Sequence, residues 1–157
     1  MKQRLLIFTS AILLTGFAYQ ITYIDPTGTY KLDSKTKNKG GDIYGYTGQI
    51  QVKKLTKDRV VMTFVVNKGA PSYNSGSFVD TLNYKDNRVI YTDPKIDTTC
   101  KITFDFNKKG VVVKEQTEDF NSGCGFGHAV VADGFFKKTS GKVPILSEPL
   151  TGKKIEK

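Results

Sequence analysis

"TCKITFDFN", residues 99–107, is the stretch that decides the fold, because apolar and polar side chains alternate along all of it. The apolar positions, which would share one face of a strand, are Cys100, Ile102, Phe104 and Phe106. A period of two is typical of an antiparallel strand with one buried and one solvated face. "NKKG" at 107–110 is a turn sequence, and "VVVKEQT" at 111–117 can run back beside the first strand. The pattern therefore predicts a β-hairpin.

Similar short segments recur on both sides of this hairpin and are separated by turn residues. They lie at 28–32, 46–55, 59–67, 76–84, 87–92 and 129–138. With the hairpin they make about eight strands. The chain has no Trp but 8 Tyr, 10 Phe and 15 Gly, which favours strands over helices, and no segment keeps an apolar period of 3.6 residues. We expect an all-β antiparallel fold in one domain.

The first and last of these segments resemble each other. Gly28-Thr-Tyr-Lys opens the first, and Gly134-Phe-Phe-Lys opens the last run of the final one. Pairing the two would close the sheet and remove its exposed edges. We therefore predict a closed or nearly closed up-and-down barrel, with a β-sandwich as the alternative.

The two cysteines, Cys100 and Cys124, are predicted to form a disulfide, as an even pair does in an oxidising compartment. In an up-and-down meander the chain leaves Cys100, turns, and returns at about residue 117, so both sulfurs reach one rim. A metal site is not expected, because there is no CxxC motif and only one His. No cofactor is expected either.

The N-terminus predicts a cleaved signal peptide, residues 1–18. Lys2 and Arg4 precede an uncharged run at 5–18 that ends in small residues suited to cleavage. The run is shorter than the roughly 20 residues that span a bilayer, so no transmembrane segment is expected after cleavage. "LLTGF" is similar to a bacterial lipoprotein signal, but Phe17 stands where the lipidated Cys would be. We expect a periplasmic or secreted protein without a lipid anchor.

After cleavage, residues 19–138 would form the barrel domain, and 139–157 a flexible tail with two prolines. Residues 34–41, with three lysines, predict a mobile loop. The formal charge falls from +9 to +7, because Lys2 and Arg4 leave with the signal peptide. The partner could be a protein, a glycan or an envelope polyanion, and nucleic acid is not expected.

Motifs for catalysis are missing from the sequence, which has neither GxSxG nor HExxH. Asp93 and Asp97 could offer oxygens to a hard cation, but they lack the ligand density of an EF-hand. We therefore predict no catalytic residues and a non-enzymatic binding module. A small hydrolase that uses a pair of carboxylates is an alternative.

"GAPSYNSGSF", residues 69–78, is longer than the two to five residues that a hairpin needs. We predict a binding loop at 70–77 on the barrel rim. The predicted contacts to a partner are Tyr73, Asn74, Ser75 and Ser77, together with His128. The alternative is a wide turn in which Asn74 and Ser75 bond to the local backbone.

Two resemblances add to this interpretation. The run "DTTCKITFDF … CGFGHAVVADGFF" resembles one in small, mostly uncharacterised secreted bacterial proteins, and implies a fold with a disulfide rather than an activity. Ser75-Gly76 is similar to the Ser-Gly loop by which periplasmic lysozyme inhibitors enter an enzyme cleft, with Phe78 or Val79 in the region of that family's Tyr. This second resemblance implies a lysozyme-inhibitor-like protein as another alternative.

Overall fold

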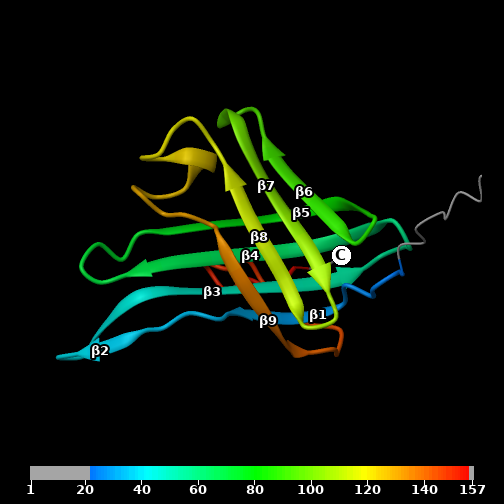
Figure 1. Ribbon diagram of the computed structural model, residues 1–157, viewed down its shortest axis with the longest axis horizontal. Helices are drawn as coiled ribbons and strands as arrows, with labels where there is room; N and C mark the ends of the chain where they lie inside the picture. The colour runs from blue at the N-terminus through cyan, green and yellow to red at the C-terminus, as the bar shows by residue number, and fades with distance from the viewer. Residues whose placement is uncertain (1–21, 156–157) are drawn as a thin grey trace, which may run out of the picture.

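The computed structural model describes residues 22–155 (Figure 1). The predicted signal peptide lies outside this range. The described residues form nine strands and one short 3-10 turn. The strands are β1 Gly28–Leu32, β2 Lys37–Lys39, β3 Asp42–Lys54, β4 Arg59–Gly69, β5 Ser75–Lys85, β6 Arg88–Asp93, β7 Asp97–Asn107, β8 Gly110–Gln116 and β9 Gly134–Ser140, and the turn η1 is Gly123–Gly125.

Eight of the strands close into an antiparallel barrel, which confirms the predicted fold class. The barrel order is β1-β9-β8-β7-β6-β5-β4-β3, and β1 also pairs with β3 to complete the ring. Lys31 of β1 lies opposite both Lys137 of β9 and Gln49 of β3. The first and last strands therefore pair as their sequences predict, and the barrel ring has no free edge there.

The ninth strand, β2, lies outside the barrel and pairs with β3 alone. The prediction of a mobile loop at 34–41 is therefore wrong for Lys37–Lys39. Gly40 and Gly41 have positive φ angles of 63° and 93°, which suits a tight hairpin turn between β2 and β3. All three residues of β2 are exposed.

Alternation along the strands places one set of side chains in the barrel interior. In β7 the four apolar residues named above are buried, as predicted. Phe64 of β4, fully buried, is the centre of an aromatic cluster. The rings of Phe78, Phe104, Phe136 and Phe126 lie 5.4, 5.5, 5.8 and 6.1 Å from its centroid. Such ring pairs stabilise by about 0.5–1.5 kcal/mol each beyond area burial.

The strands β5 and β6 separate soon after their connecting turn (Figure 1). They pair only at Tyr84 with Val89 and at Lys85 with Arg88. Farther along, the stacked rings of Phe78 and Tyr91, 3.9 Å apart, bridge the two strands. Side-chain packing thus continues the wall of the barrel where backbone pairing stops.

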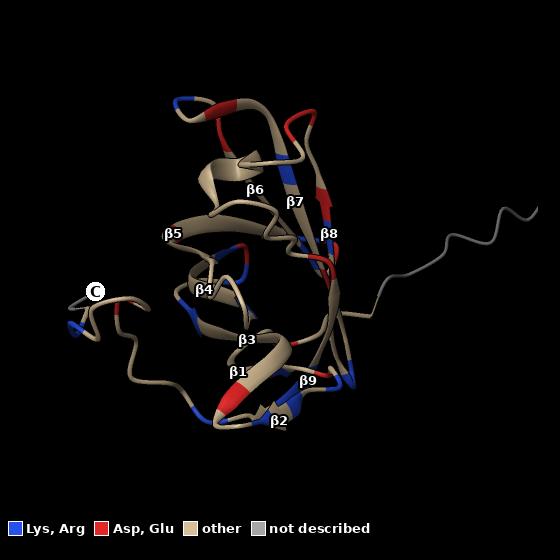
Figure 2. Cartoon of the chain, turned by 90° about the vertical axis from the view of Figure 1, so that its left-hand side faces the viewer, with Lys and Arg blue, Asp and Glu red and all other residues tan. Residues whose placement is uncertain are grey.

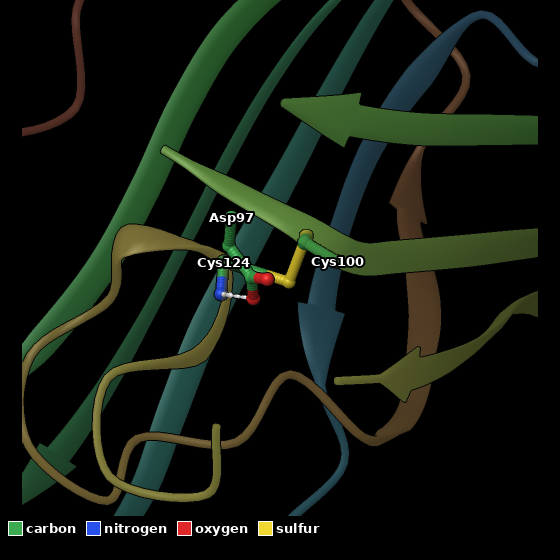
Figure 3. A group of neighbouring side chains, drawn as sticks. All are labelled: Asp97, Cys100 and Cys124. Atoms are coloured by element: carbon green, nitrogen blue, oxygen red, sulfur yellow. Dashed lines mark hydrogen bonds between the residues drawn. A yellow bond between two sulfur atoms is a disulfide. The ribbon is translucent and has the colours of Figure 1, made fainter. Parts of the chain in front are cut away.

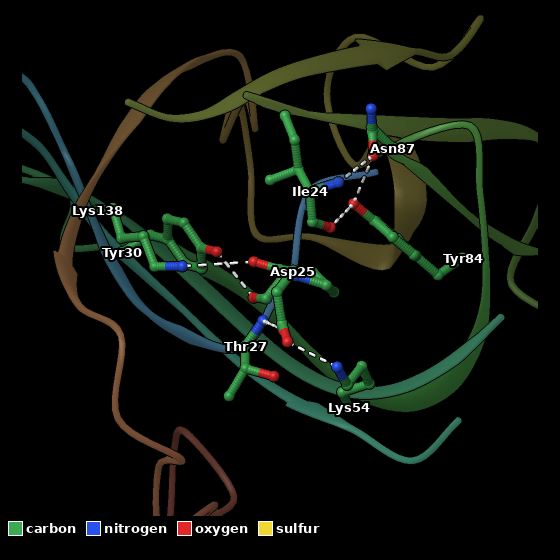
Figure 4. Close-up of polar contacts among 9 residues, drawn as sticks. Ile24, Asp25, Thr27, Tyr30, Lys54, Tyr84, Asn87 and Lys138 are labelled. Atoms are coloured by element: carbon green, nitrogen blue, oxygen red, sulfur yellow. Dashed lines mark hydrogen bonds and ion pairs between the residues drawn. The ribbon is translucent and has the colours of Figure 1, made fainter. Parts of the chain in front are cut away.

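A strap of residues 22–27 closes one end of the barrel (Figure 4). The hydroxyl of Tyr30 donates to the carbonyl of Pro26 at 2.7 Å, and that of Tyr84 donates to Ile24 at 2.6 Å. Burial raises the pKa of both tyrosines, so their hydroxyls stay protonated donors. The strap is also held by an ion pair of 2.6 Å between Asp25 and Lys54.

The C-terminal segment runs along the outside of the barrel beside β3 and β4 (Figures 1 and 2). Residues 139 and 140, which we predicted to open the tail, belong to β9 instead. Leu146 is only 4% exposed, and a short bridge joins Ser147 to Lys154. By alternation Val61 of β4 faces outward on this side of the barrel, and it too is buried.

Candidate functional site

The predicted loop lies at the end of a projecting arm built from β2, β3, β4 and the start of β5 (Figure 1). The loop folds back on β3, where the Ala70 amide donates to the Ile43 carbonyl at 2.7 Å and Tyr44 forms a bridge with Ala70. Two segments distant in sequence, 41–45 and 69–74, therefore meet. We call them the arm tip.

Two glycines allow the backbones of the arm tip to approach each other closely. Gly69 has φ of 74°, and a Cβ there would lie 2.5 Å from the Ile43 carbonyl oxygen and 2.6 Å from that of Gly45. Gly45 has φ of 103°, and its Cβ would lie 2.8 Å from the Lys35 carbonyl oxygen. Because real Cβ atoms do not approach backbone so closely, both positions require glycine. The frame of the arm tip is therefore tightly determined.

Tyr73 links the two segments through its side chain. Its hydroxyl donates to the Asp42 carboxylate, and this hydrogen bond raises the pKa of Tyr73. The ring remains 56% exposed. Its backbone φ is 52°, a conformation uncommon outside glycine, and its amide donates to the Gly69 carbonyl at 2.8 Å. Tyr73 is thus oriented by the arm tip but free on its outer face.

The arm tip exposes three large apolar side chains, and two of them, Ile43 and Tyr73, line a small groove. Ile43, Tyr44 and Tyr73 are 47%, 39% and 56% exposed. A groove of about 300 Å³ is lined by Gly41, Ile43, Gly45, Thr47, Asn67, Gly69 and Tyr73. Exposed apolar side chains gathered in one place commonly mark a site of contact with other molecules.

The remaining predicted contact residues lie on the side of the loop that meets residues 117–130. The Asn74 amide group donates to the His128 carbonyl at 2.9 Å, and the Gly127 amide donates to the Ser75 carbonyl at 2.9 Å. The structure thus brings Asn74 and Ser75 beside His128, through the His128 carbonyl and the Gly127 amide. Its imidazole is exposed.

The predicted loop, 70–77, is too long, because β5 begins at Ser75. Ser75 pairs with Asn67 and Ser77 with Val65, so the ladder between β4 and β5 continues through both serines. Ser77 is half-buried in that ladder rather than in a loop. Ser75-Gly76, the pair similar to the lysozyme-inhibitor loop, lies inside the strand, and the loop proper is 70–74.

The disulfide joins Cys100 of β7 to Cys124 of η1 at one rim of the barrel, as predicted (Figure 3). Asp97 fastens the same loop: its carboxylate accepts hydrogen bonds from the Cys124 amide at 3.0 Å and from both the amide and hydroxyl of Thr99. The Thr117 hydroxyl donates to it at 2.8 Å. These bonds, that of the Cys124 amide first, hold the pKa of Asp97 far below its usual range.

Asp97, Cys100 and Cys124 place their potential metal ligands within 4.8 Å of one another. The two sulfurs are bonded to each other, so neither offers the thiolate that a metal binds. The four donors around Asp97 already use its carboxylate oxygens. This cluster therefore holds the η1 loop against β7 and has a structural role.

Carboxylates also meet at a small groove of about 170 Å³ near the end of β8, lined in part by Glu115, Asp119 and Asp133. Burial raises the pKa of Glu115. Glu115 accepts from the Ala132 amide at 2.6 Å, and Asp133 accepts from the Glu115 amide at 2.7 Å and from Lys114 at 3.0 Å. These bonds tie β8 to residues 132–133 and account for the placement of both side chains.

Sequence reasoning missed three residues of the arm tip: Asp42, Ile43 and Tyr44. They lie in a stretch, 34–45, that it treated as a connection. The available signal was "DIYGY", in which Gly45 separates two tyrosines, since a glycine between bulky residues marks a close backbone approach.

Within residues 22–155, no helix is long and apolar enough to cross a bilayer. Comparisons of the chain with protein-family models, with curated proteins and with solved structures find no match in any of the three.

Proposed function

We propose that the protein is a non-catalytic binding module of the periplasm or the exterior of the cell, and that the arm tip is its contact surface. The observation that carries this proposal is the exposure of Ile43, Tyr44 and Tyr73 on a frame fixed by Gly45 and Gly69. A surface held in shape before binding loses less conformational entropy when a partner docks.

The chemistry of the tip favours a protein or glycan partner. Tyrosine offers a large, stiff contact area with a polar end, which suits both classes of partner. The groove between Ile43 and Tyr73 would accept one small apolar or sugar group. The expected compartment is supported by the disulfide, since disulfides persist in oxidising surroundings.

The experiment is quantitative capture from the native envelope and culture medium with three forms of the protein. The test variant is Y44A/Y73A, and the control is Phe120→Ala, because Phe120 is 84% exposed and lies in the loop 117–130, outside the arm tip. We expect the test variant to retain its partner at least about tenfold less well, equivalent to about 1.4 kcal/mol. The control variant should bind as the wild type does.

Thermal unfolding of the same proteins separates binding from folding. Substitution of exposed side chains usually changes stability by less than about 0.5 kcal/mol, so both variants should melt close to the wild type. If Y44A/Y73A kept full partner binding while folded, the arm tip would not be the contact surface.

A further inference from the structure

Lysine side chains gather on the outer face of the barrel where β1 meets β9. Lys31 and Lys137 are direct cross-strand partners, and both are exposed. Residue 137 also lies opposite Gly110 of β8, next to the β7–β8 turn. The Lys138 amide donates to the Lys109 carbonyl at 3.0 Å, which holds this turn against β9. We call Lys31, Lys137, Lys108 and Lys109 the lysine row.

The row has little acidic compensation. The ion pairs found within residues 22–155 involve Lys54, Arg88 and Lys114, none of which belongs to the row. One carboxylate, Asp33, follows Lys31 by two residues. Figure 2 shows basic segments around β9 and β2, where acidic segments also lie, and acidic segments near the far ends of β6, β7 and β8. Like charges directly opposite in a sheet are destabilising, and a bound anion would relieve this cost.

A groove of about 410 Å³ begins at Lys31 and extends over β3 and β4, with Leu32, Gly48 and Val65 as its apolar part. Its hydroxyl and amide side chains are those of Ser34, Thr36, Thr47, Gln49 and Asn67. No carboxylate lines it among the described residues. Hydroxyls and amides donate as well as accept hydrogen bonds, which matches the hydroxyl groups of a sugar.

We propose that the groove and the lysine row together bind a linear acidic polysaccharide. Sugar units would occupy the groove, and their anionic groups would reach Lys31, Lys137 and the β7–β8 turn. The charge of the row supplies long-range attraction that salt screens, and the groove distinguishes a sugar chain from other polyanions. This site adjoins the arm tip, with whose groove it shares Thr47 and Asn67, but the proposal does not rest on the function proposed for the arm tip.

The first test titrates the full chain with polygalacturonate, with dextran as a neutral polysaccharide and with polyglutamate as a polyanion without sugar. We expect polygalacturonate to bind, dextran not to bind, and polyglutamate to bind about tenfold more weakly, because it lacks the ring hydroxyls that would hydrogen-bond to the side chains of the groove. Affinity for polygalacturonate should fall steeply as salt rises.

The second test compares two double variants that lose the same charge. K31Q/K137Q should lower the affinity for polygalacturonate at least about tenfold at low salt and flatten its salt dependence. K95Q/K101Q, which removes two exposed lysines outside the row, should change the affinity less than about twofold. The melting temperature of K31Q/K137Q should equal or exceed that of the wild type, because a repulsive pair is gone.

A third variant, Q49A, tests the groove alone, because Gln49 lines this groove and not that of the arm tip. It should weaken binding of polygalacturonate and leave binding of polyglutamate unchanged. The proposal is overturned if the wild type does not bind polygalacturonate, if both lysine variants lose affinity equally, or if polyglutamate binds as tightly as the sugar polymer. None of these variants changes a residue of the arm tip or of its groove, so the two proposals are tested separately.

Discussion

The ring of Phe126 lies against the backbone of Gly76, where no side chain would fit. A Cβ on residue 76 would come within 2.2 Å of Phe126 Cγ. Phe126 is 4% exposed, and its ring lies 6.1 Å from that of Phe64 in the barrel core. Phe126 can close the disulfide end of the barrel because residue 76 is a glycine.

Gly76→Ala should therefore destabilise the protein by about 1–3 kcal/mol, the usual cost of an added methyl group in a packed core. Urea unfolding measures the change. Gly141→Ala is the control, because its Cβ would meet only Lys138 Cε, at an ordinary contact distance of 3.9 Å, and it should cost less than about 0.5 kcal/mol. The double variant G76A/F126A should lose less stability than the sum of the losses of the two single variants. Strictly additive losses would contradict the contact.

The disulfide should carry a substantial part of the stability of the domain. Its cysteines are 24 residues apart in sequence, and closing a loop of about that size stabilises by roughly 3–3.5 kcal/mol in the chain-entropy model. We expect the free energy of unfolding of C100S/C124S, measured by urea denaturation, to be lower than that of the wild type by this amount. Intact mass should show two hydrogens fewer in the native protein than after reduction. Free thiols in native protein would contradict the prediction.

Acid should weaken the strap at the opposite end of the barrel. Although partial burial opposes ionisation, hydrogen bonds from Lys54 and the Thr27 amide lower the pKa of Asp25 from 3.8 to about 2. A lowered pKa means that ionised Asp25 stabilises the fold above pH 3.8 and that this contribution is lost as the pH falls through about 2. Asp25→Asn should thus be less stable than the wild type near neutral pH.

The difference between Asp25→Asn and the wild type should shrink as the pH approaches 2. Chemical unfolding at a series of pH values measures it. Lys54→Gln is a second probe, since it removes the ion-pair partner and leaves the carboxyl group in place. Stability curves for wild type and Asp25→Asn that stay parallel over the whole range would show that Asp25 does not couple to folding.

Much of the barrel could be predicted because its buried side chains alternate. Residues 99–107 show a period of two because each second side chain enters the core. The segments that begin at Gly28 and Gly134 do form a closing pair, in antiparallel register with Lys31 opposite Lys137. Where a strand buries one face, pattern alone identifies it.

The arm tip and β2 could not be predicted in the same way, because most of their residues are exposed. β2, with three exposed residues, carries no apolar period, and its pairing with β3 depends on backbone hydrogen bonds and the turn at Gly40-Gly41. The meeting of Tyr44 and Ala70 is a long-range contact that local sequence does not encode. The contacts of Tyr73 with Asp42 and of Asn74 with the His128 carbonyl also join segments that are distant in sequence.

The last prediction concerns the fixed shape of the arm tip. Gly69 and Gly40 both have positive φ, 74° and 63°, but only at Gly69 would a Cβ meet backbone, 2.5 Å from the Ile43 carbonyl oxygen. A Cβ on Gly40 would meet nothing within 4 Å. Gly40→Ala therefore measures the cost of the backbone conformation alone, about 1–2 kcal/mol of local strain. Gly69→Ala adds a collision that the structure can relieve only by moving the loop away from β3.

In Gly69→Ala the Ala70 amide should lose its hydrogen bond to the Ile43 carbonyl, 2.7 Å long in the native fold. We expect its hydrogen exchange to become at least about tenfold faster, as a local opening becomes about 1.4 kcal/mol easier. The exchange rates of core amides, such as those of Phe64 and Phe104, should change much less, because the arm tip lies outside the barrel core. Gly40→Ala should leave the Ala70 amide protected. Equal protection of Ala70 in both variants would show that the loop does not depend on the close contact at Gly69, and the arm tip would then lack the rigid frame on which its proposed role rests.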